Sequence, residues 1–238
     1  MATRIEYLQN RVLGTLSEKL DEFYLAGGTA LSLYYFHHRQ SLDLDFFAQK
    51  FSQKSVRNII RQLSLALNKE IELISEESRK NRVKIMVYSL IIDRKRSLKL
   101  DFVEDYLKLI RPPKPINGIK VLSLEDIYLR KIYAITGTQQ IETDLGAKVT
   151  HGGRQEARDF YDLYCLSQIF MRLSAFCFKF GNPLMREGII RWFRTYSRMD
   201  IKTGLLELKL KKSIAYLEME RHFKREVEKI IEKEVSSI

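Results

Sequence analysis

The six-residue run Leu42–Phe47 alternates between apolar and acidic side chains. In a β-strand successive side chains point to opposite faces, so Asp43 and Asp45 would share one face while Leu42, Leu44 and Phe46 point to the core. Carboxylates placed this close repel each other unless a cation holds both in the charged form. The chain therefore needs a sheet with one apolar face and one face that holds a cation or another charged group.

A second strand-like run, residues 98–103, repeats the arrangement. Leu98, Leu100 and Phe102 fall on one face, and Asp101 falls on the other. If the two strands are neighbours, three carboxylates converge. Such an oxygen-rich set suits one or two Mg²⁺ ions, with Mn²⁺ as the alternative.

A glycine turn precedes the first acidic strand. Gly27, Gly28 and Thr29 lie between a short apolar strand, residues 23–26, and a helix expected over residues 30–38. Glycine lets the backbone approach a ligand closely, and the exposed N–H groups at a helix start attract phosphate. A phosphate-binding turn followed by metal-binding acids is a coherent arrangement for nucleoside triphosphate chemistry.

The remaining periodicity predicts an α+β protein. Apolar spacing predicts helices over residues 3–20 and 55–67, and alternation predicts strands over residues 70–75, 83–92 and 119–122. A helix follows from residue 123, then a polar, glycine-containing stretch over 137–153, then helices to the end. We expect a mixed sheet flanked by helices over residues 1–122 and a helical region over residues 123–238.

Composition is that of an ordinary globular protein, with 45% hydrophobic and 30% charged residues and a net charge of +11. This charge favours a polyanionic partner. From residue 169 onward, 15 Lys and Arg stand against 9 Asp and Glu. No apolar run approaches the roughly 20 residues that span a bilayer. We expect a cytoplasmic protein with no membrane contact, in which Cys165 and Cys177 are buried free thiols.

These residues carry a resemblance to the nucleotidyltransferase superfamily of DNA polymerase β type, in which a GG or GS turn, a paired-acid strand and a third acid follow in order. More closely, LAGGTALSL and HRQSLDLDFF resemble the AbiEii-type toxins of type IV toxin–antitoxin systems. The later motifs Lys131–Ala134 (KIYA) and Arg158–Asp162 (RDFYD) match that family as well. The resemblance spans roughly residues 23–166, with a polar insertion over 135–157.

The resemblance implies a polymerase β-like fold, NTP as substrate and a role for each motif. Asp43 and Asp45 would bind the metal ions on the triphosphate, and Asp101 the metal that activates the attacking hydroxyl. Gly27, Gly28 and Thr29 would hold the β and γ phosphates. The predicted catalytic residues are Asp43, Asp45, Asp101 and Lys131. The predicted nucleotide-binding residues are Gly27, Gly28, Thr29, Arg39, Lys131 and Asp159. Arg39 would contact phosphate or neutralise the acids, and Asp159, with Arg158, would order Lys131 or position the incoming nucleotide.

The sequence thus favours a Mg-dependent enzyme that transfers a nucleoside monophosphate to an acceptor. The resemblance implies a toxin with an antitoxin partner encoded nearby, and an RNA acceptor, the 3′ end of tRNA. One alternative keeps the chemistry and changes the acceptor to a protein or a small molecule such as an antibiotic. The other alternative is a non-catalytic RNA-binding module. The base of the NTP, the antitoxin and the oligomeric state leave no motif.

Overall fold

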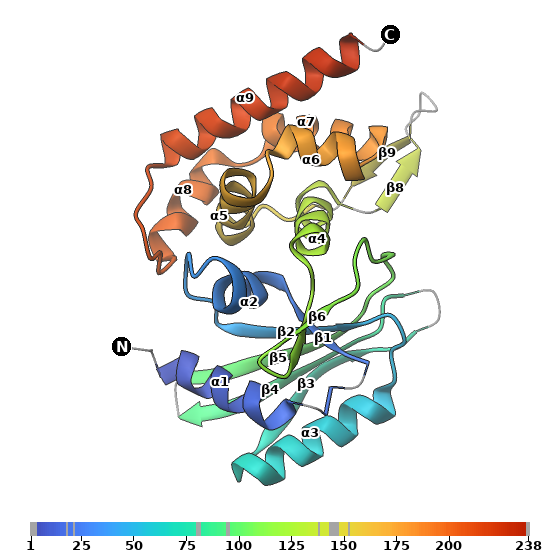
Figure 1. The fold of residues 1–238 in the computed structure, drawn as a ribbon, viewed down its shortest axis with the longest axis vertical. Helices are drawn as coiled ribbons and strands as arrows, with labels where there is room; N and C mark the ends of the chain where they lie inside the picture. Colours follow the sequence, from blue (N-terminus) through green and yellow to red (C-terminus); the bar gives the residue numbers. More distant parts are fainter. Residues whose placement is uncertain are drawn as a thin grey trace. The chain divides into compact units, whose positions relative to one another are not determined.

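The computed structural model describes residues 4–17, 19–20, 22–79, 82–93, 96–137, 139–142, 148–151 and 153–236. The chain forms two compact units (Figure 1). The first comprises Met1–Tyr35 and Ser41–Ser123, and the second comprises Phe36–Gln40 and Leu124–Ile238. The predicted division into a mixed-sheet nucleotidyltransferase core over residues 1–122 and a helical region over residues 123–238 stays a prediction.

The first unit is built on a seven-stranded mixed sheet in the order β3-β4-β5-β2-β1-β7-β6. Strands β2 and β5 run parallel, as do β1 and β7, and the other neighbours are antiparallel. The strands are β1 (Tyr24–Ala26), β2 (Asp43–Ala48), β3 (Ile71–Glu77), β4 (Ile85–Asp93), β5 (Arg96–Glu104), β6 (Lys114–Ile116) and β7 (Ile119–Val121).

One face of this sheet is the core of the first unit. Leu44 and Phe46 of β2 and Phe102 of β5 are completely buried, and the rings of Phe46 and Phe102 stack with their centroids 5.2 Å apart. The predicted inward face of β2 is thus confirmed except at Leu42, which is 52% exposed. Leu42 lies one residue before the strand, where alternation no longer fixes the side-chain direction.

Helices complete the first unit. They are α1 (Arg4–Leu16), α2 (Gly27–Ala30), its π-helical continuation η1 (Leu31–Tyr35) and α3 (Gln53–Leu67). The α3 helix begins where the Ser52 side chain accepts a hydrogen bond from the Ser55 N–H, which satisfies one of the unpaired donors of the first turn. Its predicted apolar stripe is confirmed as buried: Val56, Ile59, Ile60, Leu63 and Leu67.

The second unit is mainly helical. Its helices are α4 (Leu124–Thr136), α5 (Ala157–Cys165), the π-helical η2 (Leu166–Phe170), α6 (Leu173–Phe180), α7 (Pro183–Thr195), α8 (Arg198–Glu207) and α9 (Tyr216–Val235). Phe160 of α5 packs against Trp192 of α7 and Phe223 of α9, with centroid distances of 5.9 and 4.8 Å. Buried aromatic rings therefore hold α5, α7 and α9 together.

Two features differ from the sequence expectation. Strand β6 lies in a stretch for which the periodicity predicted no strand. It lies at the edge of the sheet, where Pro115 loses no ladder hydrogen bond to an outer neighbour. The polar stretch over 137–153 contains a two-stranded hairpin of β8 (Gln139–Glu142) and β9 (Lys148–His151). Short polar strands lack the apolar alternation from which strands are predicted.

The α+β class with a mixed sheet and a helical C-terminal region is confirmed. Both cysteines are buried and free, as predicted. Across the described ranges, no helix combines the length and the apolar character needed to cross a bilayer.

Candidate functional site

The glycine turn contacts the acidic strand directly. Strand β1 pairs with β2 so that Ala26 lies opposite Asp45, and Gly27 follows with φ = +68°. A Cβ atom on Gly27 would lie 2.2 Å from Asp45 Oδ2, which is far inside van der Waals contact. Glycine is required here for two independent reasons, because L-residues rarely adopt this φ and because the carboxylate occupies the space of a side chain.

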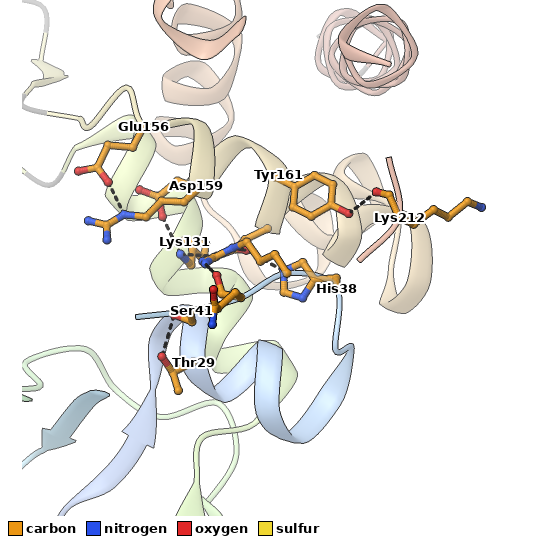
Figure 2. Close-up of polar contacts among 12 residues, drawn as sticks. Thr29, His38, Ser41, Lys131, Glu156, Asp159, Tyr161 and Lys212 are labelled. Carbon is orange, nitrogen blue, oxygen red and sulfur yellow. Dashed lines mark hydrogen bonds and ion pairs between the residues drawn. The ribbon is translucent and has the colours of Figure 1, made fainter. Parts of the chain in front are cut away.

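Thr29 holds the start of the acidic strand. Its side chain is fully buried, and its hydroxyl donates a hydrogen bond to the main-chain carbonyl of Asp43. The hydroxyl oxygens of Thr29 and Ser41 lie 2.8 Å apart (Figure 2). From α1, the buried Gln9 amide donates to the carbonyls of Ser41 and Asp43 at 3.0 and 3.3 Å. Hydrogen bonds from α1 and α2 therefore fix the backbone that carries the first acid.

The two acidic strands are neighbours, which was the condition for the three acids to converge. In the parallel pairing of β2 with β5, Asp45 lies opposite Asp101 and Asp43 lies opposite Lys99. Asp43, Asp45 and Asp101 are each half-buried, on the face opposite to the buried Leu44, Phe46 and Phe102. We call this set of Asp43, Asp45, Asp101 and Lys99 the acidic face.

Lys99 brings a positive charge to the acidic face. Its Nζ lies 2.6 Å from Asp101 Oδ2. Partial burial lowers the pKa of Lys99, but the hydrogen bond and charge of Asp101, with the charges of Asp43 and Asp45, outweigh that effect and raise the pKa above its usual value. The ammonium is thus attracted by all three carboxylates, which shows that the acidic face favours a cation.

The donor set of the acidic face fits a hard divalent cation, because carboxylate oxygens are the ligands that Mg²⁺ and Mn²⁺ prefer. Among the described residues, however, no three His, Cys, Asp or Glu side chains are arranged to close around one ion. Asp101 is paired with Lys99 instead. The residues therefore fit a metal held by Asp43 and Asp45, and the third acid has a different partner.

A second charged cluster lies inside the helical unit, around Asp162 of α5. Figure 2 shows its members Lys131 and Asp159, with His38 nearby. Asp162 is fully buried, and both of its oxygens are paired. Oδ1 accepts from Arg39 Nε at 2.7 Å and lies 2.7 Å from His38 Nε2. Oδ2 accepts from Arg39 Nη2 at 2.8 Å and lies 2.7 Å from Lys131 Nζ. Arg39 and Asp162 thus form a two-point ion pair of high geometric specificity.

Lys131 of α4 joins Asp162 to Asp159. Its Nζ lies 2.6 Å from Asp159 Oδ1, and Arg154 Nη2 lies 3.1 Å from Asp159 Oδ2. Burial lowers the pKa of Lys131, but the charges of Asp159 and Asp162 raise it overall. Burial raises the pKa of Asp162, yet Lys131 and Arg39 hold it well below its usual range. We call Arg39, Lys131, Asp159 and Asp162 the buried ion cluster.

Main-chain hydrogen bonds also hold the segment Phe36–Gln40 in the second unit. The Gln40 N–H donates to the Lys209 carbonyl and the Lys211 N–H donates to the His38 carbonyl, each at 2.9 Å. Arg39 therefore reaches the buried ion cluster from a short strand-like segment that is anchored at both ends of its backbone.

A family model described as the nucleotidyl transferase AbiEii toxin of type IV toxin–antitoxin systems matches residues 11–237. The chain belongs to the AbiEii family. It is therefore a nucleotidyltransferase of a toxin–antitoxin family, as the sequence motifs predicted. No curated protein matches the sequence.

The AbiEii assignment agrees with the likeness to two crystal structures. One is of a candidate nucleotidyltransferase from H. pylori, with a TM-score of 0.60, 17% identity and coverage of 98% of both chains. The other is of JHP933 from Helicobacter pylori, with a TM-score of 0.57, 19% identity and coverage of 98% of this chain and 94% of that one. At these identities the comparison shows a shared fold.

Within this AbiEii chain, sequence reasoning gave no role to Lys99 of the acidic face, to Asp162 of the buried ion cluster, or to His38, which contacts Asp162. For Lys99 a signal existed, since it lies two residues before Asp101 and alternation places both on one face. The partners of Asp162 gave no such signal, because Arg39 lies 123 residues away in sequence. The predicted contacts of Arg39, Lys131 and Asp159 with nucleotide stay predictions.

Proposed function

We propose that this enzyme transfers a nucleoside monophosphate from an NTP to the 3′ end of an RNA, in particular of tRNA, in a Mg-dependent reaction. The proposal depends above all on the register of β2 and β5, which aligns Asp45 with Asp101 and keeps Asp43 on the same face. An acceptor hydroxyl would attack the α-phosphorus. A new P–O bond would form as the α–β bridging bond breaks, pyrophosphate would leave, and the hydroxyl proton would pass to solvent.

Each part of the first unit would have one task. Asp43 and Asp45 would hold the divalent cation, which supplies Lewis-acid stabilisation of the charge on the phosphates. The backbone N–H groups at Gly28 and Thr29 would face phosphate oxygens. Gly27 keeps the turn close to Asp45, so that phosphate and cation sites would be adjacent. In the second unit, the ion pair between Lys131 of α4 and Asp159 of α5 supports a role for Asp159 in holding the Lys131 side chain in position.

The RNA acceptor is supported by charge. The chain carries a net charge of +11, and its part from residue 169 onward carries an excess of six positive charges. Such a surplus favours a phosphate backbone and disfavours a small cationic acceptor. A type IV toxin also implies an antitoxin as partner and the cytoplasm as its place of action, and we include both in the proposal.

The proposal is tested by incubating the full chain with Mg²⁺ and each α-³²P-labelled NTP in turn, with either purified tRNA or RNA-depleted cell protein. We expect label in tRNA for at least one NTP, and none in tRNA whose 3′ diol has been destroyed by periodate. Label in protein alone would overturn the RNA acceptor. Failure to label either fraction would overturn the proposed transfer reaction.

The Asp43→Asn variant tests the site itself. Loss of a cation ligand removes several kcal/mol of transition-state stabilisation, so transfer should fall by at least about 100-fold. Asp93→Asn is the matched control, because Asp93 pairs with Arg96 at 2.7 Å on the same sheet and outside the acidic face. Equal transfer by Asp43→Asn and Asp93→Asn would show that the acidic face is not the active site.

A further inference from the structure

Lys99 is placed among the acids by strand geometry. It lies opposite Asp43 in the β2–β5 register and two residues before Asp101, so that all four side chains of the acidic face emerge from the same side of the sheet. Its Nζ lies 2.6 Å from Asp101 Oδ2, and its side chain is 48% exposed. The ammonium therefore stands beside the third acid, Asp101.

The charge of the acidic face limits how many divalent ions it can hold. Three carboxylates and one ammonium leave a formal charge of −2, which a single divalent ion neutralises. A second divalent ion would either bind Asp101 beside the Lys99 ammonium or displace that ammonium from its 2.6 Å contact with Asp101. Both alternatives bring like charges together in a half-buried place, where Coulomb repulsion is stronger than in bulk water.

We propose that Lys99 is the second cation of the active site: it occupies Asp101, and the protein binds one divalent ion, at Asp43 and Asp45. This inference rests on the proposed function, because it assigns roles within the same site. Lys99 acts as a positioning residue that fixes Asp101 and sets the metal stoichiometry. It replaces the sequence-based expectation that Asp101 is a ligand of a second metal ion.

An ordinary surface ion pair is the competing explanation for Lys99. Such pairs contribute little to stability, and replacing one changes nothing beyond its own contact. The two explanations differ in metal binding. If Lys99 occupies a cation position, its removal frees Asp101 for a second ion, and it strengthens binding of the first ion by removing a nearby like charge. If Lys99 is only a surface partner, metal binding is unchanged.

The test is a titration of the full chain with Mn²⁺ in the absence of nucleotide. The EPR signal of free Mn²⁺ measures how much of the ion is bound. The wild-type protein should bind one Mn²⁺. Lys99→Met should bind either a second Mn²⁺ or the first one at least about tenfold more tightly. Lys99→Arg, which keeps the charge, should bind one ion like the wild type. Lys84→Met is the matched control, because Lys84 is 40% exposed and pairs with Glu104 at 2.9 Å outside the acidic face.

Each outcome decides the inference. Two Mn²⁺ ions on the wild-type protein would overturn it and leave the proposed reaction intact. Unchanged stoichiometry and affinity in Lys99→Met would also overturn it. No Mn²⁺ on the wild-type protein would overturn both the inference and the metal site of the proposed function. Circular dichroism melts of all variants confirm that they are folded, and Lys99→Gln, which also removes the charge, gives the same test should Lys99→Met be unfolded.

Discussion

The acidic face and the buried ion cluster contain the same kinds of side chain in opposite surroundings. The acidic face has three carboxylates and one ammonium, all partly exposed to solvent. The buried ion cluster has two carboxylates, Asp159 and Asp162, and two cations, Arg39 and Lys131, all at most 8% exposed. The side chains of the acidic face carry a formal charge of −2 and are partly exposed, while those of the buried ion cluster sum to zero charge and are enclosed.

This difference separates residues that we expect to bind a ligand from residues that we expect to stabilise the fold. Buried charges are tolerated only when they are paired, and the loss of one partner leaves the other desolvated and alone. Accessible like charges destabilise the protein slightly but remain available to a cation. We therefore expect changes in the buried ion cluster to affect stability first, and changes in the acidic face to affect ligand binding first.

The largest expected effect is in the buried ion cluster. Asp162→Ala removes the common partner of Arg39 and Lys131, and it should lower the free energy of unfolding by about 3–5 kcal/mol. Urea unfolding measures this change. Glu187→Gln is the control within the same unit, because it removes only the surface pair with Arg191 and should stay within about 0.5 kcal/mol. A loss below about 1 kcal/mol for Asp162→Ala would contradict the assignment of a structural role.

A smaller effect is expected at the glycine turn. Gly27→Ala imposes a side chain at φ = +68° and against Asp45, so it should cost about 1–2 kcal/mol and reduce transfer by displacing Asp45. Gly14→Ala is the matched control. Gly14 lies in α1 with no atom within 4 Å of its added Cβ, so alanine there should stabilise the protein by about 0.5–1 kcal/mol. The same sign for both variants in thermal melts would disprove this view of the turn.

The pH dependence offers a third measurement, in the helical unit. His222 is buried with Nε2 2.7 Å from Ser167 Oγ. Burial, then the charges of Arg172, Arg225 and Lys229, lower the pKa of His222 to about 4, against the opposing charge of Glu226. The unfolded chain therefore takes up a proton near pH 6.5 that the native protein does not bind until about pH 4.

Stability should consequently fall as the pH decreases from 6.5 to 4, and His222→Gln should remove part of that fall. Over this window we expect the Tm difference between variant and wild type to change by about 2–4 °C in favour of the variant. Asp162 contributes little here: because its pKa is lowered in the native protein, its contribution to stability is lost only as the unfolded chain takes up the proton at about pH 3.9, at the lower limit of this window. Parallel Tm curves for the two proteins would refute the linkage.

The smallest stability effect is expected on the acidic face. Asp43→Asn removes one of three like charges and keeps the shape of the side chain, so the free energy of unfolding should change by no more than about 0.5 kcal/mol. Chemical denaturation checks this value next to Asp162→Ala. A loss as large as that of Asp162→Ala would erase the contrast between the two regions.

Local patterns in the sequence predicted the acidic face well, because alternation determines which side chains share a face. Alternation placed Asp43 and Asp45 on one face of their strand and Asp101 on the outer face of its own strand. The glycine pair marked the turn before the first acidic strand. The strand β6 was missed because Pro115 is unfavourable in most strands and tolerated only at an edge. Whether a strand lies at the edge depends on the order of strands in the assembled sheet, and the sequence of one strand does not reveal that order.

The buried ion cluster was only partly predictable. The resemblance singled out Arg39, Lys131 and Asp159 for the nucleotide, with the ordering of Lys131 as the alternative role of Asp159. The structure shows a protein partner of each, and that of Asp159 is Lys131. Pairing between Arg39 and Asp162 depends on how α5 packs, which short-range periodicity does not determine. Sequence patterns assigned no role to His38, and tertiary packing gives it Asp162 as a partner.

The segment Phe36–Gln40 has a consequence for how this polypeptide can be divided. The backbone leaves the sheet-based unit after Tyr35, returns at Ser41 and leaves again after Ser123, so the two units are linked by three covalent junctions. A fragment ending near residue 122 would carry the Arg39 guanidinium without the carboxylate that neutralises it, and the complementary fragment would lack one of its cations. A single cut after Ser123 would therefore not divide the polypeptide along its two units, because Phe36–Gln40 of the second unit would stay with the first.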